Sequence, residues 1–215
     1  MQYSSAYPDH MAPESGRRIA GVLLAAGTAT RMGANKLLFD LGGEPVVRRV
    51  ARQAIEAGLS PVLAVLGFEA SRVAAALEGL PVEAVFNAHY ATGMNASVQL
   101  GIARVPADCA AAVVVLADMP LVTSNMLTAM VERYRAGDEP LVISTYGDVQ
   151  APPTLYSRAL FPQFVGPEGE GCGRRIVREH RDRAAVVRWP AQLLADLDRP
   201  EDVELLRGRF LGAPS

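Results

Sequence analysis

The chain of 215 residues has few of the residues that form disulfide frameworks or cysteine- and histidine-based metal centres. Its two cysteines, Cys109 and Cys172, lie far apart with no Cys-x-x-Cys spacing, and its three histidines are scattered. The pattern therefore gives no indication of a zinc or haem site. Isolated thiols are typical of a reducing compartment, so we expect a cytoplasmic protein with reduced cysteines.

The chain also lacks a long apolar run and an excess of either charge. No apolar run reaches the roughly 18 residues that a membrane span needs, so we expect no membrane partner. The formal net charge is -2. Nucleic-acid binding normally needs a basic face, so we expect no nucleic-acid partner. Residues 1–17 lack the layout of a secretory signal peptide and are expected to form a flexible N-terminal tail.

Beyond that tail, residues 18–211 have the composition of one α/β domain, because the chain is 50% hydrophobic and 20% charged. Apolar runs alternate with helical patterns, which predicts a mostly parallel, Rossmann-like sheet with helices on both faces. Strands are expected at 19–24, 37–41, 61–66, 82–86, 110–116, 141–145, 154–156 (returning antiparallel) and 185–188. Helices are expected at 45–57, 69–77, 96–103, 124–134, 157–164, about 174–180 and from 200.

Ligands of such sheets bind beyond the carboxyl ends of the strands. The loops expected there are 25–36, 87–95 and 117–122. An extended segment at 193–197 would bring residues 196–198 to the same edge. We therefore expect a binding site where these four segments meet.

Residues 24–36 carry the strongest local signal. A buried strand runs into a loop with Gly27 and Gly33, whose backbone can approach phosphate oxygens, and Arg31 and Lys36 add positive charge. The loop is neither a Walker A motif nor a Gly-x-Gly-x-x-Gly dinucleotide fingerprint. It indicates a site for a phosphorylated ligand; the alternative is a surface turn with two solvated cations.

Two acidic segments complete the candidate site. Asp118 follows the most apolar strand, where it could hold Mg²⁺ on a phosphate or brace the next turn. Asp196 and Asp198 alternate along an extended segment and so share one face; the alternative for Asp198 is capping the last helix. Asp118 and Asp198 together would bind one Mg²⁺, which with Arg31 and Lys36 would neutralise a triphosphate and stabilise leaving pyrophosphate.

Residues 24–36 read Leu-x-x-Gly-x-x-x-Arg-Met-Gly-x-x-Lys, which resembles the signature loop of nucleotidyltransferases with a sugar-nucleotide-pyrophosphorylase-like (GT-A) fold. The branch that it resembles most is the molybdopterin cytidylyltransferases, which attach CMP to the molybdenum cofactor. The resemblance extends from residue 19 to about 207. Residues 92–97 resemble the Gly-Met-x-x-Ser segment of that family, 116–122 its metal-aspartate segment, and 196–202 its Asp-x-Asp-Thr-Pro-Glu-Asp segment.

The resemblance implies a Mg²⁺-dependent enzyme that transfers CMP from CTP to the phosphate of molybdopterin and releases pyrophosphate. It implies Asp118 and Asp198 as metal ligands and Arg31, Lys36 and Asp118 as catalytic residues. The residues implied to bind the nucleotide are Leu24, Ala25, Ala26, Gly27, Arg31, Lys36, Gly93, Asn95 and Ser97. For Asn95 and Ser97 the alternative is ordinary helix capping.

Ala26 bears on the choice of base. The cytidylyl branch has Leu-Ala-Ala-Gly here and the guanylyl branch Leu-Ala-Gly-Gly, so the Ala26 methyl group favours a pyrimidine over a purine. The acceptor side departs from the family: Gln150-Ala151-Pro152-Pro153 replaces Arg-Gly-x-Pro, and residues 169–174 replace Gly-Asp-x-Gly-Ala-Arg. Arg199 also stands where Thr is usual.

These departures leave three alternatives open. The enzyme could transfer GMP from GTP, or it could use another phosphorylated acceptor. It could also be a nucleotide-binding maturation factor with reduced activity, whose partner would be a molybdoenzyme or its chaperone.

Overall fold

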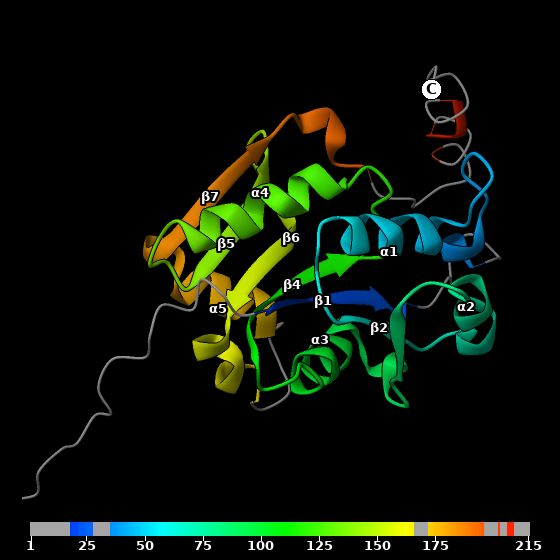
Figure 1. The fold of residues 1–215 in the computed structure, drawn as a ribbon, viewed down its shortest axis with the longest axis horizontal. Coiled ribbons are helices and arrows are strands. Elements are labelled where there is room, and N and C mark those ends of the chain that lie inside the picture. The colour runs from blue at the N-terminus through cyan, green and yellow to red at the C-terminus, as the bar shows by residue number, and fades with distance from the viewer. Residues whose placement is uncertain (1–17, 28–34, 166–171, 196–201, 203–205, 209–215) are drawn as a thin grey trace, which may run out of the picture.

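A seven-stranded sheet with the order β3-β2-β1-β4-β6-β5-β7 forms the centre of the molecule (Figure 1). The computed structural model describes residues 18–27, 35–165, 172–195, 202 and 206–208. Neighbouring strands are parallel except at β6, which runs antiparallel to both β4 and β5. The strands are β1 (Arg18–Ala25), β2 (Val62–Leu66), β3 (Val82–Phe86), β4 (Cys109–Leu116), β5 (Leu141–Tyr146), β6 (Val149–Ser157) and β7 (Ala184–Trp189). The predicted mostly parallel α/β sheet and its antiparallel return are confirmed.

Helices pack against both faces of the sheet (Figure 1). One face is covered by α1 (Val46–Glu56), α2 (Ala70–Ala76) and α4 (Ser124–Arg135). The other is covered by α3 (Met94–Ala103), α5 (Cys172–Glu179) and the 3-10 segment η4 (Arg158–Phe164). Side chains of a strand point alternately to the two faces, so in β1 Leu23 joins one core and Leu24 the other.

A glycine lets α3 lie directly on β1. A Cβ atom at Gly101 would lie 2.4 Å from Cγ1 of Val22, closer than real side chains approach. This close contact fixes the height of α3 above the sheet, and with it the start of α3 at the carboxyl end of β1.

The predicted strand at 37–41 is wrong. Residues Lys36–Leu38 form a 3-10 turn, η2, because the Asn35 side chain accepts a hydrogen bond from Leu37 N and starts the turn. Asp40 makes only an isolated bridge with Pro45. The apolar run there reflects the burial of Leu37 in the core rather than strand pairing.

Several predicted helices differ in type or start. The segment expected to be helical at 157–164 is the 3-10 segment η4, which contains Pro162, a residue that cannot donate a helical hydrogen bond. Helices α3 and α5 begin at Met94 and Cys172, two residues earlier than expected. The expected extended segment at 193–197 begins in the 3-10 turn η6 (Ala191–Leu193). Most of the predicted last helix lies outside the described residues.

Within the part of the chain that the structure describes, no helix is long and apolar enough to cross a membrane.

Candidate active site

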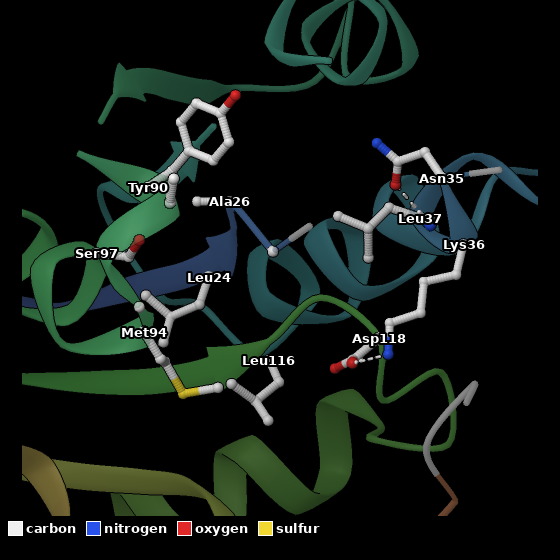
Figure 2. Close-up of a pocket in the computed structure, with 13 residues that line it drawn as sticks. Leu24, Ala26, Asn35, Lys36, Leu37, Tyr90, Met94, Ser97, Leu116 and Asp118 are labelled. Atoms are coloured by element: carbon white, nitrogen blue, oxygen red, sulfur yellow. Dashed lines mark hydrogen bonds and ion pairs between the residues drawn. The ribbon is translucent and has the colours of Figure 1, made fainter. Parts of the chain in front are cut away.

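A pocket of about 320 Å³ lies at the carboxyl ends of β1 and β4 (Figure 2). The two strands stay joined as they enter it, because Ala117 N donates to Leu24 O at 3.1 Å. Described residues of the loops at 25–36, 87–95 and 117–122 all contribute to its wall, as expected for this edge of the sheet. The lining residues are Leu24, Ala26, Gly27, Asn35, Lys36, Leu37, Tyr90, Ala91, Gly93, Met94, Ser97, Leu116 and Asp118.

Lys36 and Asp118 form an ion pair at one end of the pocket (Figure 2). Lys36 Nζ lies 2.6 Å from Asp118 Oδ2, and the two side chains are 23% and 22% exposed. Asn35, which starts the η2 turn, holds the backbone of Lys36, while Asp118 follows the buried strand β4. A partly shielded cation beside a carboxylate suits a phosphate bound together with a metal ion, because shielding from water strengthens the interactions between charges.

Ala26 and Tyr90 lie at the other end of the pocket (Figure 2). Ala26 is buried, 4% exposed, and the loop carrying Tyr90 packs against it through Gly67. A Cβ atom at Gly67 would lie 2.4 Å from Tyr90 Cβ and 2.7 Å from Ala26 O. Only glycine therefore allows the end of β2 to hold Tyr90 against the end of β1.

A buried polar pair joins the residue after β3 to α3 beside the pocket. The Asn87 side chain donates from Nδ2 to Ser97 Oγ at 2.9 Å, and its Oδ1 accepts from His89 N at 2.9 Å. Gly93 caps α3 with φ 120°, a conformation that side chains rarely adopt. The loop after β3 is thus held in one shape by Asn87 and turned into α3 by Gly93.

Most, but not all, of the residues predicted to bind the nucleotide line the pocket. Those that line the pocket are Leu24, Ala26, Gly27, Lys36, Gly93 and Ser97. Ala25 instead packs in the core below the pocket. Arg31 lies outside the described residues, as does Asp198, which is predicted as a metal ligand.

Asn95 does not cap α3, because Gly93 occupies the capping position and α3 begins at Met94. The side chain of Asn95 accepts from Cys172 N at 3.0 Å, so it joins α3 to the start of α5. The role of Asn95 in nucleotide binding stays a prediction.

The donor set around Asp118 fits a divalent metal held largely by its substrate. Among the described residues, no group of three or more His, Cys, Asp or Glu side chains could hold a metal ion alone. Mg²⁺ commonly uses one or two carboxylates and takes its other ligands from phosphates and water. Asp118, open to the pocket and beside a cation, meets that description.

Both thiols are poor candidates for nucleophiles. Cys109 and Cys172 are buried, and burial raises the pKa of each thiol above its ordinary value. Neither lines the pocket. The site therefore suits direct transfer between two bound substrates better than a cysteine-linked intermediate.

One of the segments that depart from the resembled family takes part in a surface contact. Gln150, at the start of β6, accepts a hydrogen bond from Arg181 at 2.8 Å. Of the second departing segment, 169–174, the described residues Cys172, Gly173 and Arg174 form the start of α5.

Sequence reasoning missed three residues around the pocket: Asn35, Asn87 and Tyr90. Asn87 directly follows β3, and a polar residue after a parallel strand is a recognisable signal for the ligand edge. Asn35 precedes an apolar run that resembled a strand, which concealed its role in starting a turn. The position of Tyr90 depends on Gly67, a contact between distant residues that no local pattern reveals.

Comparison with known proteins identifies relatives over most of the chain. Residues 21–184 match the model of the MobA-like NTP transferase domain. Purine catabolism protein PucB of Bacillus subtilis is 28% identical over 199 residues, covering 88% of this chain and 96% of PucB. Bifunctional protein GlmU of Kineococcus radiotolerans is 34% identical over 170 residues, 77% of this chain. The chain spans only 33% of the length of that GlmU.

The fold also matches solved structures. The crystal structure of Rv0371c from Mycobacterium tuberculosis has a TM-score of 0.78 and 25% identity, covering 92% of this chain and 99% of Rv0371c. A second structure of Rv0371c, described as a complex with manganese, has a TM-score of 0.70.

Proposed function

The chain belongs to the family of MobA-like NTP transferase domains, and from this premise we propose that it transfers CMP from CTP to the phosphate of molybdopterin. The ion pair of Lys36 and Asp118 in the pocket is the observation on which the proposal chiefly rests. The family makes the protein a nucleotidyltransferase. The nucleotide, the acceptor and the metal ion are parts of the proposal.

In the proposed reaction a phosphate oxygen of molybdopterin attacks the α-phosphorus of CTP. The bond from that phosphorus to the bridging oxygen breaks, and pyrophosphate leaves. Both substrates are anions, so the site must offset their repulsion. Lys36 would do so at the phosphates, with Arg31 as a second cation from outside the described residues.

Asp118, together with Asp198 from outside the described residues, would hold a Mg²⁺ ion, which when bound polarises phosphate oxygens and neutralises the pyrophosphate. Binding and orienting the nucleotide would depend on residues of the chain itself. Leu24, Leu116, Ala26 and Gly27 line the pocket, so they would lie close to a bound nucleotide. These groups would orient the triphosphate for in-line attack.

The base would lie at the end of the pocket away from Lys36, near Ala26 and Tyr90. The methyl group of Ala26 occupies space there, since the residue is buried and lines the pocket. A pyrimidine needs less room than a purine, so this end favours CTP over GTP.

The acceptor is tested by measuring pyrophosphate release from CTP and Mg²⁺ with reduced molybdopterin, with GTP and other phosphorylated acceptors in parallel. We expect release with CTP and molybdopterin, and its loss in Asp118→Asn. Pyrophosphate release only with GTP, or only with another acceptor, would show that the proposed substrates are wrong. The protein would still be a nucleotidyltransferase. Nucleotide binding without release from any acceptor would favour the maturation factor.

A further inference from the structure

The amide of Asn87 can point in only one way. The residue is 3% exposed and sits directly after β3, where its backbone N donates to Leu66 O at 2.9 Å. His89 N lies 2.9 Å from Asn87 Oδ1, and a backbone N–H can only donate. The carbonyl oxygen must therefore face His89, which leaves the NH₂ group facing Ser97.

This orientation fixes the role of the Ser97 hydroxyl. Asn87 Nδ2 lies 2.9 Å from Ser97 Oγ, and an amide NH₂ can only donate, so Ser97 accepts from it. The hydroxyl proton must then point elsewhere. Ser97 makes no other hydrogen bond within the described part of the chain, yet it is 4% exposed and lines the pocket.

Because Ser97 lines the pocket, a bound ligand is the group that could accept from that hydroxyl. Figure 2 shows Ser97 on the side of Ala26 and Tyr90, away from the Lys36–Asp118 ion pair. A buried donor without a partner is costly, at roughly 1–3 kcal/mol, so a ligand that supplies an acceptor there gains affinity. Cytosine offers two such acceptors on its ring edge, O2 and N3.

We propose that Asn87 is a positioning residue that locks Ser97 as a hydrogen-bond donor to an acceptor on the edge of the bound base. The inference rests on the proposed function, because it takes the ligand to be CTP with its phosphates at Lys36. Asn87 itself does not touch the ligand; it sets which way the hydrogen bond of Ser97 runs.

Asn87→Asp tests this with almost no change of shape. A carboxylate still accepts from His89 N, but its second oxygen can only accept, so Ser97 must now donate to it. Ser97 then presents lone pairs to the base instead of a proton. We expect the dissociation constant for CTP with Mg²⁺, measured by calorimetry, to rise on the order of tenfold. In turnover we expect the loss to appear in the KM for CTP more than in kcat.

A double-mutant cycle with Ser97→Ala separates the effect of the new negative charge from the effect that acts through Ser97. If Asn87 acts through Ser97, Asn87→Asp in the Ser97→Ala background changes CTP affinity by less than twofold. An equal loss in both backgrounds would mean simple charge repulsion and would overturn the inference. Unchanged CTP affinity in Asn87→Asp alone would also overturn it.

The wild-type protein provides a second measurement if the variants do not fold. In a crystal structure with CTP and Mg²⁺ we expect Ser97 Oγ within hydrogen-bond distance of O2 or N3. A contact with the exocyclic amine of cytosine, or with no atom of the base, would contradict the inference. If the wild-type protein does not bind CTP at all, the proposed function fails instead, so the two failures are distinguishable.

Discussion

Lys36 Nζ lies 2.6 Å from Asp118 Oδ2, so the carboxylate proposed to hold a metal ion is paired with a lysine. A metal ion approaching Asp118 alone would meet the positive charge of Lys36. A triphosphate changes this, because its oxygens attract both the lysine and the metal ion. The ion pair therefore favours joint binding of metal and nucleotide over binding of the metal alone.

Asp118→Asn should remove most of the activity. The amide keeps the size of the side chain but loses the negative charge that would hold Mg²⁺, so we expect kcat/KM to fall by roughly a hundredfold or more. Pyrophosphate release measures this. A variant that folds normally and keeps more than a tenth of wild-type activity would contradict the metal role of Asp118.

Lys36→Met should separate metal binding from nucleotide binding. Without the lysine charge, Asp118 is free to attract a cation, so we expect tighter binding of Mn²⁺ in the absence of nucleotide. We expect weaker binding of CTP, by about tenfold, because a charge-assisted contact to phosphate is lost. Calorimetry with each ligand alone checks both directions. Lys36→Arg is the control that keeps the charge, and weaker Mn²⁺ binding in Lys36→Met would contradict this account.

Ala26→Gly should broaden the choice of base. Removing the methyl group enlarges the pocket near Tyr90, so we expect the ratio of CTP to GTP use to fall by about tenfold or more. Competition between the two nucleotides in one reaction measures the ratio directly. Equal use of CTP and GTP by the wild-type protein would show that this methyl group does not select the base.

Gly67→Ala should distort the same end of the pocket. The new Cβ would meet Tyr90 Cβ and the carbonyl oxygen of Ala26, so strain should cost about 1–3 kcal/mol of stability and displace Tyr90. We expect a lower Tm and a higher KM for CTP. Gly208→Ala is the matched control, since its Cβ would meet nothing within 4 Å. A Tm equal to the wild type in Gly67→Ala would contradict the close packing.

Cys109 should make the fold less stable at alkaline pH. Burial raises the pKa of this thiol above its ordinary value, so the folded state holds the proton more tightly than the unfolded state. The resulting stability is fully present below pH 9 and is lost as pH rises through the folded pKa. Thermal unfolding at pH 7 to 10 should therefore show a smaller alkaline decline for Cys109→Ala than for the wild type. Parallel pH profiles would contradict it.

The sequence predicted the strands of the sheet well because their signal is local. Runs such as 110–116 are apolar throughout, which is typical of a strand buried on both faces, and β4 spans Cys109–Leu116. The prediction of a strand at 37–41 failed because an apolar turn and an apolar strand have similar sequences. The hydrogen bond from Leu37 N to the Asn35 side chain distinguishes them, and the sequence does not reveal it. Local composition reports burial more reliably than backbone pairing.

The sequence predicted the charged residues of the site but not the contacts that hold the surrounding residues in place. Lys36 and Asp118 stand out because each follows or closes a recognisable motif, and the structure pairs them. The contacts between Gly67 and Tyr90 and between Asn87 and Ser97 join separate segments of the chain. No local sequence pattern shows that these segments lie close together. Such contacts set how the side chains around the pocket are oriented. Residue types alone do not reveal that orientation.

Strand β6 runs against its two neighbours and so divides the sheet into two groups of parallel strands. The pocket draws on β1 and β4 on one side of this divider, while β5 and β7 lie on the other. Neither β1 nor β4 pairs directly with β5 or β7. A substitution in β5 or β7 is therefore separated from the paired strands at the pocket by the full width of β6.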